Sequence, residues 1–255
     1  IIVVNEFPVS FPSKQPLKIA VIADLHVGPF KGEAFVERAV QKINGLFPDI
    51  ILIAGDFLFD ERSDASALTP LKELRSALGT FAVLGNHDGG HFLTINRQPL
   101  DMMDRSAELE SVLKSLGITV LRNSAQIIPL ANEKIAIAGV DDIWIPGSSV
   151  TRSLQDIPEG TPTILLTHNP DTILDPESRK AELIVAGHTH GGQVRLPFYG
   201  PVPALPTRLG RRYDQGIFSL PPASTLAITR GIGESLARSR LFAWPEVMLL
   251  KTVSD

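Results

Sequence analysis

The feature that most constrains this 255-residue chain is a set of five short apolar runs, each followed within two residues by aspartate, asparagine or histidine. The runs are KIAVIA (18–23), IILIA (50–54), FAVL (81–84), TILL (163–166) and ELIVA (182–186). Such runs of Ile, Val, Leu and Ala are typical of strands buried on both faces of a sheet. Because the carboxyl ends of parallel strands meet at one edge of a sheet, the polar residues that follow are predicted to form one site there.

The first half of the chain has the pattern of alternating strands and helices. This βαβαβ order predicts a parallel sheet with right-handed crossovers. The predicted strands and helices, in chain order, are 17–23, 33–44 (helix), 49–55, 65–78 (helix), 80–85 and 105–116 (helix).

The second half is predicted to be more antiparallel. Segments 118–121, 125–130 and 134–140 lie close together and are interpreted as a meander or hairpin. Further strands are predicted at 163–167, 182–187, 216–220, 224–229 and 246–252, with a short helix at 171–179. Two sheets packed face to face, with helices outside, would accommodate both halves.

We predict a single domain over 1–255, with an extended segment at 1–16 and a long loop at 191–215 that is too long for a simple turn. The hydrophobic content of 44% suffices for one large core, and no apolar run reaches the roughly 18 residues of a membrane span. The chain begins at Ile1, which indicates processing or truncation. A cytoplasmic or an envelope-associated location is therefore expected, with any N-terminal anchor or signal upstream of the chain.

Composition excludes several kinds of partner and site. The net charge of −4 gives no electrostatic case for nucleic-acid binding, and no nucleic-acid partner is expected. The absence of cysteine excludes disulfides and thiolate metal ligands. No obligate protein partner is inferred.

The polar residues after the apolar runs make a metal-ligand set. It consists of Asp24, His26, Asp56, Asn86, His168, His188 and His190. Oxygen and imidazole ligands without sulfur suit divalent Mn, Fe, Co, Ni or Zn. Seven ligands are too many for one ion, but if one carboxylate bridges they supply four to each of two ions, an arrangement used for displacements at phosphorus. The pairs in Asp24-x-His26 and His188-x-His190 project to one side if the chain is locally extended.

Other polar residues near these motifs have two interpretations each. His87 either protonates a leaving alkoxide, with Asp88 orienting its imidazole, or supports the ligands. Arg195 either pairs with a substrate phosphate or forms a structural ion pair. His91 is either a substrate contact or a residue at the surface or the pocket rim. Asp142 either lines the cleft or belongs to a turn.

Further residues downstream could face an amphipathic substrate. Trp144 either lines the cleft or packs in a turn. Phe198, Tyr199 and Leu205 either form a lipid-accepting wall or pack within their loop. The arginine cluster either faces an anionic head group or is a solvated surface; its members are Arg208, Arg211 and Arg212.

The ordered motifs Asp24-x-His26, Gly55-Asp56, Gly85-Asn86-His87-Asp88, His168 and Gly187-His188-x-His190 resemble the calcineurin-like metallophosphoesterase superfamily. The resemblance covers 17 to about 190. It implies an α/β fold, an αββα sandwich of two mixed β-sheets flanked by helices, with a dimetal site at the C-terminal strand ends. It also implies His87 beside the scissile phosphate. The implied ligands are Asp24, His26, Asp56 and His190 for one ion, and Asp56, Asn86, His168 and His188 for the other, with Asp56 bridging.

The downstream segments 188–201, 211–218 and 231–250 resemble the bacterial YkuE/YaeI-like phosphodiesterase branch. The resemblance implies hydrolysis of a phosphodiester or phosphomonoester by metal-bound hydroxide, with two divalent ions and Mn favoured. The expected substrate is a small phosphoester or a lipid-linked phosphate, and peripheral membrane association would follow from the latter. One alternative is a UDP-2,3-diacylglucosamine pyrophosphatase-like enzyme. A noncatalytic scaffold is disfavoured, because such relatives lose ligands and none is missing here.

Overall fold

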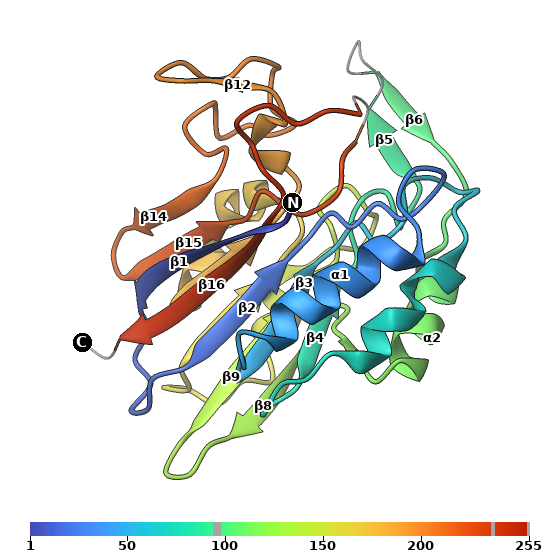
Figure 1. Ribbon diagram of the computed structural model, residues 1–255. Coiled ribbons are helices and arrows are strands. Elements are labelled where there is room, and N and C mark those ends of the chain that lie inside the picture. The colour runs from blue at the N-terminus through green and yellow to red at the C-terminus, as the bar shows by residue number, and fades with distance from the viewer. Residues whose placement is uncertain (94–97, 236–237, 254–255) are drawn as a thin grey trace.

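The computed structural model describes residues 1–93, 98–235 and 238–253, and these form two six-stranded sheets packed face to face (Figure 1). The strand order of the first sheet is β1 (Val3–Ser10), β16 (Glu246–Val253), β2 (Lys18–Ile22), β3 (Ile50–Ala54), β4 (Thr80–Val83) and β7 (Thr119–Val120). In this sheet β2, β3, β4 and β7 run parallel, β16 is antiparallel to β2, and β1 is parallel to β16. The predicted extended start is therefore largely an edge strand.

The second sheet is more parallel than its sequence predicts. Its order is β14 (Gly216–Leu220), β15 (Ser224–Ile228), β11 (Leu183–Ala186), β10 (Thr163–Leu166), β9 (Lys134–Gly139) and β8 (Ser124–Pro129). Only the two edge pairs, β8–β9 and β14–β15, are antiparallel. The central strands are buried on both faces, as is usual for parallel strands.

The predicted meander over 118–140 is wrong in one respect. β7 lies beside β4 in the first sheet, whereas β8 and β9 form a hairpin in the second. Ile118 and Val120 pack into the core under the helices, so this segment is held by the first sheet before the chain crosses over. Asn123 lies at this crossing with a left-handed backbone, φ 46°.

Three hydrophobic layers make the αββα sandwich, and the predicted fold is confirmed. The outer layer on the first sheet packs against α1 (Glu33–Asn44) and α2 (Ser106–Ser115). The middle layer joins the sheets, and the third layer packs α3 (Val150–Leu154) and neighbouring 3-10 turns on the second sheet. α1 buries Val36, Ala39, Val40 and Ile43, the stripe that the 3.6-residue period predicts.

Two predicted helices are 3-10 helices instead. The first spans Ala65–Glu73 and contains Pro70, which lacks the N–H that a regular α-helix needs there. The second is divided into Pro170–Leu174 and Pro176–Lys180, with Pro176 starting the new turn. Among the described residues, no helix is long and apolar enough to cross a membrane.

Two small hairpins project beyond the sandwich at the top of Figure 1. One is formed by β5 (His91–Leu93) and β6 (Pro99–Asp101), the other by β12 (Arg195–Leu196) and β13 (Gly200–Pro201) within the long loop. Neither was predicted from sequence, because strands of two or three residues are too short for a periodic signal.

Candidate metal centre

All seven candidate ligands are buried where the carboxyl ends of β2, β3, β4, β10 and β11 meet. Their exposed fractions range from 0% for Asp24 and His168 to 7% for His190. Buried carboxylates and imidazoles are rare without a partner that offsets their desolvation. The burial of seven such side chains in one place therefore indicates a preformed polar site at this edge of the sandwich.

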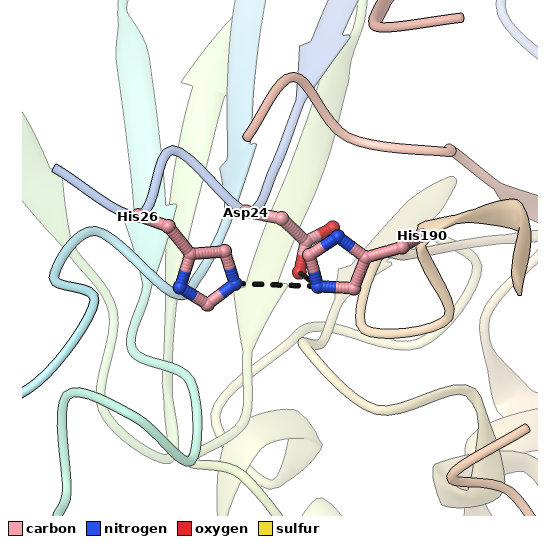
Figure 2. Close-up of side chains that lie close together, drawn as sticks. All are labelled: Asp24, His26 and His190. Atoms are coloured by element: carbon pink, nitrogen blue, oxygen red, sulfur yellow. Dashed lines mark hydrogen bonds and ion pairs between the residues drawn. The ribbon is translucent and has the colours of Figure 1, made fainter. Parts of the chain in front are cut away.

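The first ligand group contains Asp24, His26 and His190, whose ligand atoms lie within 4.8 Å of one another (Figure 2). The Nε2 atoms of His26 and His190 are 3.2 Å apart, and the two rings stack with an interplanar angle of 16°. His190 Nε2 is also 3.6 Å from Asp24 Oδ1. Three ligand atoms thus face one small volume.

The second ligand group contains Asp56, His168 and His188. His168 Nε2 lies 3.3 Å from Asp56 Oδ2 and 3.0 Å from His188 Nδ1. The same Oδ2 atom of Asp56 is 3.5 Å from Nε2 of His26 in the first group. One carboxylate oxygen therefore lies between the two groups.

The outward-facing ring nitrogens of three ligands contact backbone carbonyls. His168 Nδ1 is 2.6 Å from Ala54 O, and His188 Nε2 is 2.9 Å from Pro206 O. His26 Nδ1 is 3.3 Å from a third carbonyl. Because a carbonyl only accepts, each outer nitrogen of a neutral ring carries the hydrogen and the inner nitrogen presents its lone pair to the centre. Pro206 also shows that the 191–215 loop reaches a ligand.

Two buried oxygens at the centre have no hydrogen-bond partner among the described residues: Asp24 Oδ2 and Asn86 Oδ1. Asn86 is oriented by its Nδ2, which donates to the carbonyl of His91 at 2.6 Å. Leaving a buried acceptor unpaired costs about 1–3 kcal/mol. Facing lone pairs and orphaned oxygens are what divalent cations would satisfy, so the donor set fits such ions.

Five candidate ligands adopt left-handed backbone conformations. The φ angles are 55° at Asp24, 45° at His26, 57° at Asp56, 69° at His188 and 54° at His190. The two paired motifs therefore do not meet the condition of a locally extended chain, although both pairs do face the centre. A non-glycine residue in this region costs of order 1–3 kcal/mol and persists where the surroundings impose it, typically at functional sites.

Burial and mutual charge set the protonation of the centre. Burial lowers the pKa of His26 and of His188 to about 3. Burial also opposes protonation of His168, but the Asp56 carboxylate raises the pKa of His168 to about 10. Burial raises the pKa of Asp24 to about 7. The centre therefore combines neutral imidazoles with one protonated histidine paired to the shared carboxylate.

Asp88 has different partners from those predicted. Its Oδ2 accepts from the backbone N–H of Gly85 at 2.9 Å and of Asp56 at 3.0 Å. Its Oδ1 accepts from the N–H of Phe57 and Leu58 at 2.9 and 3.1 Å. The predicted bond from Asp88 to the His87 ring is therefore wrong, because all four contacts go to the loops that carry the ligands.

His87 lies beside the ligands, as its position after Asn86 suggested. Its Nδ1 contacts the carbonyl of Phe59 at 2.7 Å, and its backbone N–H donates to Asp56 Oδ1 at 3.0 Å. Its ring centroid is 4.5 Å from that of His26. His87, Asp56 and His26 also form a cluster of ligand atoms within 4.8 Å.

The two tentative substrate contacts have partners within the protein. Arg195 forms an ion pair with Asp214 and donates to the carbonyl of Gly191. His91 Nδ1 lies 2.9 Å from Asp101 Oδ1 across the β5–β6 hairpin. Asp142 is fully buried, and its Oδ1 accepts from the N–H of Trp144 in a turn.

Three neighbours of the centre carry no motif signal. Arg240 is half-buried and donates to the carbonyls of His190 and Gly233, which ties these two segments together beside the first ligand group. At Gly231, φ 64°, a Cβ would collide with Asp24. Trp144 packs edge-on against His188 with centroids 5.0 Å apart. For Trp144, the sequence left open whether the side chain lines the cleft or packs in a turn.

Comparisons with known proteins agree with this geometry. The sequence model of the calcineurin-like phosphoesterases matches residues 17–192. The chain is 33% identical to the phosphodiesterase YaeI of Escherichia coli, covering 93% of this chain and 83% of that protein. It is 31% identical to the uncharacterized metallophosphoesterase YkuE of Bacillus subtilis, covering 90% and 77%.

A more distant relative and a solved structure extend the comparison. The UDP-2,3-diacylglucosamine pyrophosphatase LpxG of Chlamydia trachomatis is 26% identical, covering 97% of this chain and 87% of that protein. The phosphopantetheinyl hydrolase PptH of Mycobacterium tuberculosis has a similar fold, with a TM-score of 0.51 at 15% identity, covering 93% and 96% of the two chains.

Proposed function

Since this chain belongs to the calcineurin-like phosphoesterases, a family of metal-dependent phosphoester hydrolases, we propose that it hydrolyses a phosphodiester at a two-cation centre bridged by Asp56. Asp24, His26, Asp56 and His190 would hold one cation, and Asp56, Asn86, His168 and His188 the other. The observation that carries the proposal is the position of Asp56 Oδ2, 3.5 Å from a nitrogen of the first group and 3.3 Å from one of the second.

Two divalent cations, when bound, would lower the pKa of water and neutralise charge on the phosphoryl group. The remaining work falls to residues of the chain. The Phe59 carbonyl holds the Nδ1 hydrogen of His87, so Nε2 is the atom that takes up and delivers a proton to the leaving oxygen. Asp88 holds the backbone of the Asp56 turn, and Arg240 holds the carbonyl of His190.

The decisive experiment compares wild type with Asp56→Asn on bis(p-nitrophenyl) phosphate with added Mn²⁺, the cation we propose as most effective. Because Asp56 is shared, we expect the variant to lose at least about 10³-fold in kcat and to bind fewer cations by elemental analysis. Arg195→Ala, whose partner is Asp214, serves as control and should retain most of the activity. Near-wild-type turnover in Asp56→Asn with full metal content would refute the bridging role.

A lipid-linked phosphate is the second candidate substrate, favoured by an exposed apolar surface on the long loop. Phe198 is fully exposed and Tyr199 is 61% exposed, whereas Leu205 is buried and cannot join them. The Arg211 guanidinium lies over the Tyr199 ring at 4.3 Å, which places a cation beside the apolar tip. Val194 bridges this loop to a second exposed segment that carries Phe242.

This second candidate predicts peripheral association with anionic lipid. We expect the protein to sediment with phosphatidylglycerol vesicles, and the double variant Phe198→Ser, Tyr199→Ser to remain in the supernatant while its activity on bis(p-nitrophenyl) phosphate is unchanged. Phe47→Ser, an exposed apolar position after α1, is the matched control. Equal sedimentation of the double variant and wild type would exclude this surface.

A further inference from the structure

The long loop 191–215 contacts one candidate ligand of the second group, His188, at its outer nitrogen. The carbonyl of Pro206 lies 2.9 Å from His188 Nε2, and because a carbonyl only accepts, Nε2 carries the hydrogen. His188 Nδ1 then presents its lone pair to the centre, 3.0 Å from His168 Nε2. A partner of this kind fixes the orientation of a ligating imidazole, and its loss typically costs about 10–100-fold in cation affinity. The position of the Pro206 carbonyl therefore bears directly on the second ligand group.

A buried carboxylate fixes the two residues that follow Pro206. Asp171 is only 4% exposed, and its Oδ1 and Oδ2 both accept from the backbone N–H of Arg208, at 3.0 and 2.9 Å. Its Oδ1 also accepts from the hydroxyl of Thr207. Hydrogen bonds to a charged acceptor are stronger than neutral ones, so Asp171 pins the chain immediately after Pro206.

Asp171 also belongs to the segment that carries the other histidine of the group. It follows His168 by three residues, and its own N–H donates to Asn169 Oδ1 at 2.9 Å at the start of the 3-10 helix Pro170–Leu174. Asn169 and Asp171 are both buried, so this joint lies inside the protein. Asp171 therefore joins the chain beside His168 to the loop that contacts His188.

The other neighbours of His188 do not replace the Pro206 carbonyl. Trp144 packs edge-on against the imidazole with centroids 5.0 Å apart, which limits where the ring lies but offers no acceptor to Nε2. The backbone N–H of His188 donates to Asp24 Oδ1 at 3.2 Å, which holds the main chain and not the ring. Of these three neighbours, only Pro206 orients the ring through its outer nitrogen.

We propose that Asp171 is a positioning residue for the cation of the second ligand group: it fixes the chain after Pro206, and so keeps the Pro206 carbonyl on His188 and the imidazole in its ligating orientation. The proposal rests on the two-cation centre proposed above and concerns how that same site is held. The Asp171 carboxylate bonds to a backbone N–H and a hydroxyl, so it acts through Pro206 and not on the substrate. Loosening this joint should weaken one of the two cation-binding steps and spare the other.

Calorimetry with Mn²⁺ on Asp171→Ala and Asp175→Ala tests this assignment. Asp175 is the matched control, because its carboxylate caps the next 3-10 helix by accepting from Glu177 N–H at 3.0 Å and, among the described residues, has no contact with the long loop. We expect wild type and Asp175→Ala to bind two cations alike, and Asp171→Ala to bind one of them about 10–100-fold more weakly with the other unchanged. A purely structural role for Asp171 would lower Tm without moving either affinity.

Electron paramagnetic resonance of the bound Mn²⁺ gives a second readout. Two ions that share Asp56 are magnetically coupled in wild type, whereas Asp171→Ala with the same Mn²⁺ should show the spectrum of an isolated ion and regain the coupled one in excess Mn²⁺. Thr207→Val removes only the hydroxyl contact to Asp171 and should weaken the same step by a smaller factor. Circular dichroism checks folding, and Thr207→Val decides the question if Asp171→Ala does not fold.

NMR of the histidine side chains in the metal-free protein separates failure of this proposal from failure of the function. In EDTA the Nε2 hydrogen of His188 should exchange slowly with solvent in wild type and Asp175→Ala, and this slow exchange should be lost in Asp171→Ala. Slow exchange retained in Asp171→Ala, cation affinities equal to those of the control, or equal weakening of both steps overturns the proposal. Fewer than two cations bound by wild type refutes the two-cation function instead, and the NMR result then still decides whether Asp171 holds His188.

Discussion

Replacing Asp88 by asparagine weakens a buried hub that holds the turns of the candidate metal centre. Each carboxylate oxygen of Asp88 accepts two backbone N–H groups at 2.9–3.1 Å. Asparagine would replace one oxygen by an NH₂ group, so two of the four contacts would become donor against donor. Burial raises the pKa of Asp88 to about 7, so the carboxylate is fully ionised above about pH 8, where the comparison is made. Two hydrogen bonds to this charged acceptor contribute about 3–6 kcal/mol, and partial relaxation reduces the expected loss to about 3 kcal/mol. For a chain of this size that lowers Tm by roughly 6–12 °C.

Thermal unfolding by circular dichroism in EDTA measures this loss without stabilisation by bound cations. In the folded variant the Asp56 turn is held less firmly, so calorimetry should show about tenfold weaker Mn²⁺ binding. Asp64→Asn is the matched control. The Asp64 carboxylate caps its helix by accepting from Ser66 N–H at 2.9 Å, and asparagine caps as well as aspartate, so the Tm of Asp64→Asn should change by less than about 2 °C. An Asp88→Asn Tm equal to that of the control would refute the hub.

Three further predictions concern charge and cations. Arg195→Ala leaves Asp214 without its partner, so we expect a lower Tm with little change in kcat, and a large kcat loss at unchanged Tm would instead indicate a substrate contact. The pKa of His168 is raised to about 10, so below that pH a cation must displace a proton from this ring. Between about pH 8 and pH 9, Asp24 is already ionised, because burial raises its pKa only to about 7. Apparent Mn²⁺ affinity, followed by calorimetry, should therefore rise about tenfold per unit over that range, and a flat profile would contradict this reasoning. Saturating Mn²⁺ should raise Tm above its value in EDTA by an amount that grows with concentration, whereas a concentration-independent Tm would show that cations do not bind the folded state preferentially.

Much of the local structure follows from sequence because it depends on neighbours along the chain. The apolar runs before Asp24, Asp56 and Asn86 form parallel strands, and the amphipathic period of 33–44 forms a helix. The 3-10 helix at Ala65–Glu73 departs from its predicted helix because Pro70 interrupts the hydrogen-bond ladder. Burial patterns and backbone preferences along the chain are enough to predict these features.

Sheet membership and loop geometry depend on distant contacts and could not be predicted. The segment 118–121 has the pattern of a meander strand, but packing under α2 places β7 in the first sheet. The Asp24 side chain packs directly against Gly231, which comes more than two hundred residues later in the chain, and a Cβ at that position would collide with it. Sequence proximity predicts a bond from Asp88 to His87, whereas in the folded chain Asp88 accepts from four backbone N–H groups, three of them in the Asp56 turn.

Residue types and their order along the chain were enough to predict the chemistry of the candidate site, namely oxygen and imidazole groups gathered at strand ends. Residue type and strand register suffice for that, because parallel strands deliver their ends to one edge. The position of Asp56 Oδ2 between the two groups of candidate ligands, by contrast, can be seen only in the folded chain. That position depends on how the loops after five strands pack against one another, and no local sequence pattern encodes the packing of loops that are distant in the chain.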